Sequence, residues 1–90
     1  MPLYSNLVTL GTAATLVVPP RTMGQEVHLH NATKNSNHYI HLGGPEITVN
    51  NSIHIDPGES ITITLGPGDD LYALSDPSGL KLGVLAVLQD

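Results

Sequence analysis

The sequence predicts an all-β protein, an antiparallel β-sandwich of about eight short strands, with barrel-like closure as the alternative. Three observations carry this prediction. Leu, Ile, Val and Thr dominate, and there is no Phe or Trp, which suits strands better than helices. Nine Gly and seven Pro supply turn signals, which recur roughly every eight to twelve residues. Finally, no window has the 3.6-residue apolar period of an amphipathic helix.

The turn signals divide the chain into short apolar or alternating segments, which we expect to be the strands. They cover residues 6–10, 13–18, 25–31, 37–43, 46–49, 53–56, 60–65, 70–75 and 80–88. The separators contain Gly, Pro, Asn or Ser, which favour the backbone angles of turns. We expect one domain, residues 7–90, preceded by an N-terminal arm, residues 1–6, that packs on a neighbour through Leu3 and Tyr4.

Alternation along the strands predicts the register of two hairpins. The expected apolar pairs are Val27 with Leu42 and Leu29 with Ile40 in the first hairpin, and Ile47 with Ile55 and Val49 with Ile53 in the second. The other face of the first hairpin would then place His28 opposite His41 and His30 opposite Tyr39. In the segment 60–65, Ile and Leu alternate with Thr, which is typical of a half-buried strand.

The last segment, LKLGVLAVLQ, is apolar on both faces. One face carries Leu and Val at even positions from Leu80 to Leu88, whereas Leu85 and Val87 occupy the other. A strand of this kind is either central in its sheet or covered by another subunit. The sequence therefore adds Leu85 and Val87 to the residues expected at an interface.

The charge composition limits the partners. Three basic residues stand against eight acidic ones, giving a net charge of −5. This argues against nucleic acid and anionic membranes, which bind basic surfaces. Charged residues make up 12% of the chain, about half the usual ~25%, so we expect much of the surface to be covered by partners or by copies of the chain. The sequence has no export signal, no apolar run of about 20 residues and no cysteine.

Four of the five histidines lie between residues 27 and 42, in VHLHNATKNSNHYIHL. His28 and His30 would project from the same face of a strand about 6.6–7 Å apart, and His41 could be a third metal ligand. Three points argue against a zinc site. The face is an outer one, and Glu26 is the one carboxylate expected near enough to orient the imidazole rings. No Glu is placed to act on a zinc-bound water. We therefore expect these histidines to form an interaction surface, with no cofactor.

Catalytic motifs are equally weak. GQEVHLHN followed by GPGD resembles the cupin pattern faintly, but the Glu ligand expected after His30 is missing. A cupin-like enzyme using His28, His30 and His41 is thus a minor alternative. No Gly-x-Ser-x-Gly motif occurs. We expect Asp69-Asp70 to be an acidic turn that begins the next strand, and not a catalytic or metal-binding pair of carboxylates. The sequence predicts a protein that is not an enzyme.

The order of several motifs resembles a family of small all-β virion proteins of tailed phages, notably those of actinobacteria. The matching stretches are VTLGTAATLVVPP, GQEVHLHNAT, YIHLGGPEITVNNSIHI, ITITLGPGDDLYALS and GVLAVLQ, which together span residues 7 to 88. The resemblance implies a capsid decoration or cement protein that binds the major capsid protein on the outer surface of the virion and stabilises the head. It also implies self-association, most commonly as a homotrimer.

The residues that we expect at interfaces are Leu3, Tyr4, His28, His30, Tyr39, His41, Leu85 and Val87. Two alternative functions fit the same composition. One is a tail or head–tail structural protein. The other is a glycan-binding β-sandwich module, for which Tyr39 and Tyr72 would be the stacking residues and which the absence of Trp disfavours.

Overall fold

The computed structural model describes residues 3–33, 38–48, 50–76 and 78–89. These residues form eight strands and no helix. The described part of the chain therefore contains no helix that could span a membrane. The strands are β1 (Leu3–Thr9), β2 (Thr15–Val18), β3 (Gly24–Asn31), β4 (Tyr39–Gly43), β5 (Ile53–Ile55), β6 (Ser60–Leu65), β7 (Leu71–Asp76) and β8 (Lys81–Gln89). The predicted all-β class is confirmed.

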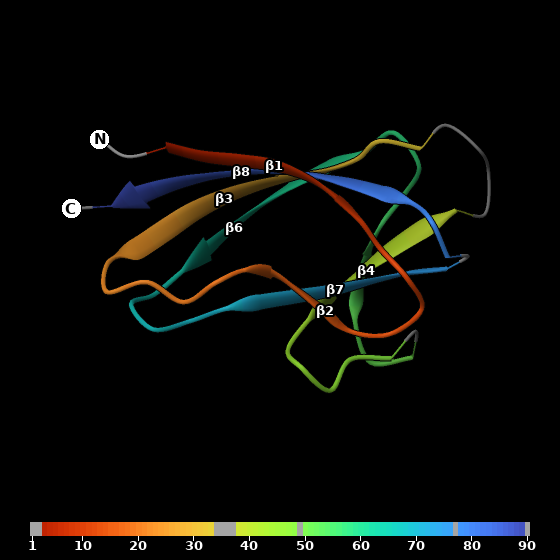
Figure 1. The fold of residues 1–90 in the computed structure, drawn as a ribbon, viewed down its shortest axis with the longest axis horizontal. Helices are drawn as coiled ribbons and strands as arrows, with labels where there is room; N and C mark the ends of the chain where they lie inside the picture. Colours follow the sequence, from red (N-terminus) through yellow and green to blue (C-terminus); the bar gives the residue numbers. More distant parts are fainter. Residues whose placement is uncertain (1–2, 34–37, 49, 77, 90) are drawn as a thin grey trace.

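The strands form two four-stranded antiparallel sheets, which lie as two layers in Figure 1. The first sheet has the order β1-β8-β3-β6 and the second β2-β7-β4-β5. Only the β4–β5 connection stays within a sheet; every other connection crosses to the opposite layer. This arrangement is an eight-stranded jelly roll. The sheets do not close into a barrel, so the sandwich is confirmed and the barrel alternative is not.

The first predicted hairpin does not form. β3 pairs with β6 and β8, whereas β4 pairs with β5 and β7. Val27 and Leu29 therefore lie on the opposite sheet from Ile40 and Leu42, although all four side chains are buried in one core. The prediction failed because alternation identifies the core-facing side of a strand and does not identify its neighbour in the sheet.

The second predicted hairpin is also wrong. Ile55 pairs with Ile40 of β4, and Ile53 pairs with Leu42. Ile47 belongs to no strand, and Val49 lies outside the described residues. In place of the expected strand at 46–49, residues 44–48 and 50–52 belong to a connection, here called the 44–52 loop, that contacts the outer side of the second sheet.

The 44–52 loop is held by one close apolar contact. Ile47 packs on Gly43, where a Cβ atom would collide with the Ile47 side chain. Ile47 is 9% exposed and Leu74, on the outer side of β7, is 3% exposed. Neither belongs to the central core cluster. The second sheet thus carries a small apolar cluster on its outer side, which the sequence did not predict.

The last strand is central in its sheet, and its inner side is covered by the core while Leu85 on its outer side remains 37% exposed. β8 lies between β1 and β3, with Leu82, Val84 and Ala86 buried in the core. β1 runs continuously from Leu3 and pairs with β8 over its whole length. The expected break between an arm and a domain after residue 6 therefore does not occur, because residues 3–6 already belong to the sheet.

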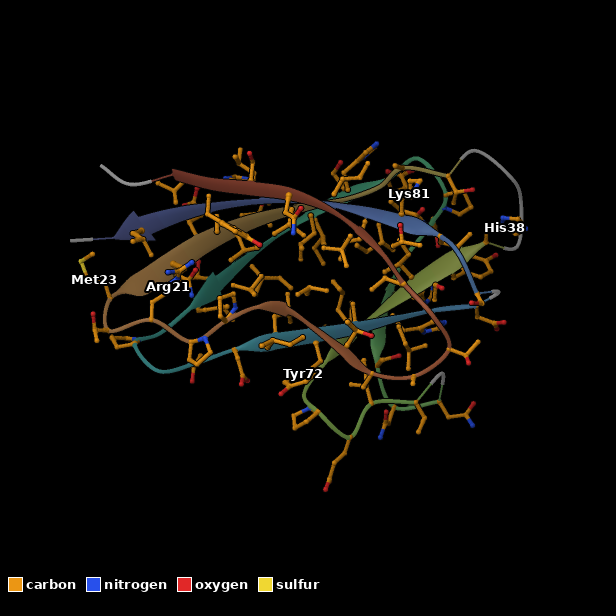
Figure 2. All side chains as sticks on the ribbon, viewed as in Figure 1. Arg21, Met23, His38, Tyr72 and Lys81 are labelled. Atoms are coloured by element: carbon orange, nitrogen blue, oxygen red, sulfur yellow. The ribbon has the colours of Figure 1, made fainter. Side chains whose placement is uncertain are left out.

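The core fills the layer between the sheets, as the side chains in Figure 2 show. It is aliphatic, as the composition predicted, and consists of Leu10, Val17, Val18, Val27, Leu29, Ile40, Leu42, Ile55, Leu65, Leu71, Ala73, Leu80, Leu82, Val84 and Ala86. On β6, the expected alternation is confirmed: Thr62 and Thr64 are exposed, whereas Ile61 and Ile63 pack against the core.

Candidate functional site

The outer side of the first sheet carries four of the eight predicted interface residues, His28, His30, Leu85 and Val87. The register places Leu85 of β8 opposite His28 of β3, and Gly83 opposite His30. On the other side of β8, Leu7 of β1 lies opposite Gly83. We call this surface, formed by Leu7, Glu26, His28, His30, Ser60, Thr62, Gly83, Leu85 and Val87, the outer face.

Hydroxyl groups from β6 fix the two histidines of the outer face. His28 Nδ1 lies 3.0 Å from Thr62 Oγ1, and His30 Nδ1 lies 2.9 Å from Ser60 Oγ. His28 Nε2 lies 3.0 Å from Glu26 Oε1, so both ring nitrogens of His28 have a hydrogen-bond partner. The sheet register causes these contacts, because it places His28 opposite Thr62 and His30 opposite Ser60.

A shallow hollow of about 290 Å³ lies at the centre of the outer face. Its lining includes His28 and His30 from β3, Ser60 from β6, and Gly83 and Leu85 from β8. Gly83 contributes no side chain, which leaves the space between Leu7 and His30 open. Two exposed side chains at or beside this hollow are apolar: Leu7 is 57% and Leu85 37% exposed.

Charge is sparse on the outer face. Glu26 is its one acidic residue among those described, and it is paired with His28. The other acidic residues of the described chain lie in turns, in the 44–52 loop or at the end of β7. A surface with exposed apolar side chains and little charge favours contact with another protein, because desolvation costs little there.

The three candidate metal ligands are not brought together. His28 and His30 lie on the first sheet, whereas His41 projects from the outer side of the second sheet, where its β5 neighbour is His54. The predicted pairing of His28 with His41 is wrong for the same reason as the first hairpin. Among the described residues, no group of three or more His, Asp or Glu side chains could hold a metal ion.

His41 occupies a different environment, beneath the 44–52 loop. It is 8% exposed, and its Nδ1 lies 2.9 Å from Ser52 Oγ of that loop. Its ring centroid is 6.0 Å from that of His54. Burial is the main cause that holds the pKa of His41 below its ordinary value; His54 adds to the effect and Asp76 opposes it.

The remaining predicted interface residues lie apart from the outer face. Tyr39 is on the second sheet, where its ring meets that of His54 at a centroid distance of 5.3 Å. Tyr4 packs against the core, and Arg21 lies 5.8 Å from the centre of its ring. The Leu3 side chain lies outside the described part of the structure. The predicted interface residues therefore lie in three places: on the outer face, on the second sheet, and, for Tyr4, against the core.

The predicted interface residues did not include five members of the outer face: Leu7, Glu26, Ser60, Thr62 and Gly83. Alternation in the predicted strand 6–10 carried the signal for Leu7, since Val8 faces the core. Gly83 interrupts the apolar last strand at an outward position, and a glycine inside a strand is a sign of close approach by another group. Two further exposed apolar residues, Leu16 and Ile53, lie on edge strands of the second sheet.

No protein family and no curated protein matches this sequence. A solved structure of a Bacillus endospore appendage protein, from a novel family of disulfide-linked pili, is similar in fold. The two chains superpose with a TM-score of 0.60 and are 13% identical, over 99% of this chain and 87% of that one. At this identity the likeness shows the fold alone. Because this chain has no cysteine, disulfide links cannot form between its copies.

Proposed function

We propose that this chain is a non-enzymatic structural subunit of a phage particle, a decoration protein that binds the outer surface of the capsid and stabilises the head. The observation that carries the proposal is the outer face. It combines exposed Leu7 and Leu85, a hollow at Gly83 and histidines already held by hydrogen bonds.

The fold and the sequence resemblance support the same role. Jelly rolls are the folds of many viral capsid domains, although lectins and cupins share them. The motif order resembles small virion proteins of tailed phages over residues 7 to 88. The structurally similar appendage protein belongs to pili, which agrees with a structural role for this fold. In the absence of cysteine, stability must come from many noncovalent contacts repeated over the particle.

The outer face could act by simple mass action. A subunit that binds the assembled capsid and not its dissociated parts stabilises the assembled state in proportion to its occupancy. Full burial of an exposed leucine side chain contributes about 1.5–3 kcal/mol; Leu7 and Leu85, which are 57% and 37% exposed, would each contribute a part of this on binding. Because many copies bind one shell, modest affinity per copy is sufficient.

The test uses heads of the phage that encodes the chain, prepared with its gene deleted. We expect such heads to release DNA at a lower temperature, and the purified chain to co-sediment with them and restore the wild-type temperature. The double variant Leu7→Glu/Leu85→Glu should fold but fail to bind. Leu16→Glu, at an exposed leucine of the second sheet, is the matched control and should bind normally. If the wild-type chain is found in tails, or does not bind heads, the proposal is wrong.

A further inference from the structure

The four edge strands of the sandwich differ in how far they are protected against pairing with another chain. The edges are β1 and β6 in the first sheet and β2 and β5 in the second. β5 has three residues and β2 has four. β2 also has a register irregularity between Leu16 and Val18, and Pro19-Pro20 follows it. Short, irregular or proline-flanked strands are poor templates for another strand.

β1 is long, but its edge is blocked by its own side chains. The Leu7 backbone N–H donates to Asn6 Oδ1 at 2.9 Å, which removes a donor that an added strand would need. Asn6 Nδ2 in turn donates to the Tyr4 hydroxyl at 3.2 Å. Arg21 lies over the Tyr4 ring and places a charge beside this edge. Edge charges of this kind disfavour pairing.

β6 has none of these protections. Its sequence, SITITL, contains no charge, proline or glycine. All six residues pair with β3 on one side. On its other side, within the part of the chain that the structure describes, no backbone hydrogen bond outside the strand ladders involves Ile61 to Leu65. Alternating Ile and Thr is a strong β-forming pattern, so β6 is the edge most able to accept another strand.

We propose that β6 pairs with β6 of a second copy of this chain, which makes the first sheets of the two copies one continuous eight-stranded antiparallel sheet. A twofold axis normal to the sheet relates the strands, and this axis keeps the core side of both copies on the same side. Two residues opposite each other must then both have even numbers or both have odd numbers. With Thr62 on the axis, Ile61 lies opposite Ile63 of the other copy, and Ser60 opposite Thr64.

Charge and side-chain chemistry select a second copy as the occupant. The chain has a net charge of −5, so most contacts between copies bring like charges together. β6 carries no charge, and opposed Ile–Ile and Thr–Thr pairs are favourable cross-strand neighbours. Glu59 precedes the strand, and Asp69 follows it in a turn where its Oδ2 accepts the Gly66 N–H at 3.0 Å. These acidic turns confine the pairing to β6.

This inference goes beyond the proposed function, because it concerns contacts between free copies and requires no capsid. The contact is twofold, so it predicts dimers of the free chain and not the trimers that the family resemblance implies. It also leaves the outer face of both copies on one side of the joined sheet, available to a partner.

Cross-linking tests the pairing directly, because the chain has no cysteine and each variant carries a single thiol. Thr62→Cys places the thiols of two copies opposite each other at the twofold axis. Mild oxidation should convert it to a covalent dimer at least ten times faster than Ser5→Cys. Ser5 is also exposed and lies on β1, the other edge of the same sheet. Equal rates for the two variants would overturn the proposal.

Sedimentation velocity gives a second measurement that does not depend on oxidation. The wild type and the control Ser5→Lys should sediment as dimers at tens of micromolar. Thr64→Lys adds a charge to the β6 edge and should raise the dimer dissociation constant at least tenfold, with an unchanged circular dichroism spectrum. A wild type that sediments as a monomer or trimer overturns the proposal. Dimers that fail to bind phage heads would overturn the proposed function and leave this proposal intact.

Discussion

Gly43 lies so close to Ile47 that a Cβ atom at position 43 would collide with the Ile47 side chain. This contact fixes the 44–52 loop over the second sheet, where Ile47 and Leu74 are buried outside the main core. The φ of Gly43 is outside the left-handed region. Close packing, and not backbone conformation, is therefore the reason that glycine is required.

We expect Gly43→Ala to lower the free energy of unfolding by about 1–3 kcal/mol, the usual cost of overpacking a well-filled site. Urea unfolding followed by circular dichroism measures the change. Gly44→Ala is the matched control, because nothing lies within 4 Å of a Cβ added there. Equal unfolding midpoints for the two variants would show that the loop adjusts freely and that the Gly43–Ile47 contact does not hold it.

The 44–52 loop also makes stability depend on pH through His41. Burial and His54 hold the pKa of His41 below its ordinary value in the folded chain. The unfolded chain therefore binds more protons in the range between these two pKa values, so the free energy of unfolding falls as the pH is lowered through this range. Below the folded-state pKa this contribution becomes constant.

The corresponding measurement is the urea midpoint of the wild type and His41→Gln between pH 7.5 and pH 5. We expect the midpoint of His41→Gln to fall less than that of the wild type, because its side chain does not titrate. Leu16→Gln, at an exposed position of the second sheet, is the control and should follow the wild type. The same pH dependence in His41→Gln as in the wild type would contradict the assignment.

The sequence was sufficient to predict the core-facing side of β3, β4 and β6, but not the neighbours of each strand. The inward positions Val27, Leu29, Ile40 and Leu42 were all identified correctly. Their pairing was wrong because nearly every connection in a jelly roll crosses between the sheets. Two strands that share a core have the same alternation whether they lie side by side or face to face.

The same limit explains what could be predicted of the candidate site. Outward positions such as His28, His30 and Leu85 were found from alternation, and they do share one surface. His41 is also outward, but from the other sheet, so its assignment to the same surface was wrong. The burial of His41 could not be predicted, because it depends on a loop whose conformation is set by the tertiary contact between Gly43 and Ile47.

Asn31 links the two sheets at the end of β3 and is fully buried. Its Nδ2 donates to the carbonyl oxygens of His38 and Ile55, at 3.0 Å and 2.9 Å. Asn31→Ala leaves both carbonyl groups without this donor and opens a small cavity. We expect it to lower the free energy of unfolding by about 2–4 kcal/mol, measured by urea unfolding.

Asn50→Ala, at an exposed position in the 44–52 loop, provides the control for Asn31 and should change stability by less than about 0.5 kcal/mol. Asn31→Asp tests the mechanism further, because it replaces the donor by a charge that faces two carbonyl oxygens. It should be at least as destabilising as Asn31→Ala at pH 7. Stability close to wild type in either Asn31 variant would mean that this link between the sheets is dispensable.

The arrangement of the histidines predicts that the chain has no stoichiometric zinc site. Zinc sites in proteins use at least three protein ligands, and no such group occurs among the described residues. On the outer face, both nitrogens of His28 are already hydrogen-bonded, one of them to Glu26. We therefore expect weak zinc binding by calorimetry that is unchanged in His41→Gln. Leu85→His is the positive control: residue 85 lies opposite His28, so it adds a third imidazole to the same face and should bind zinc at least tenfold more tightly. If the untagged wild type retains one zinc ion per chain in native mass spectrometry, the histidines form a metal site and not only an interaction surface.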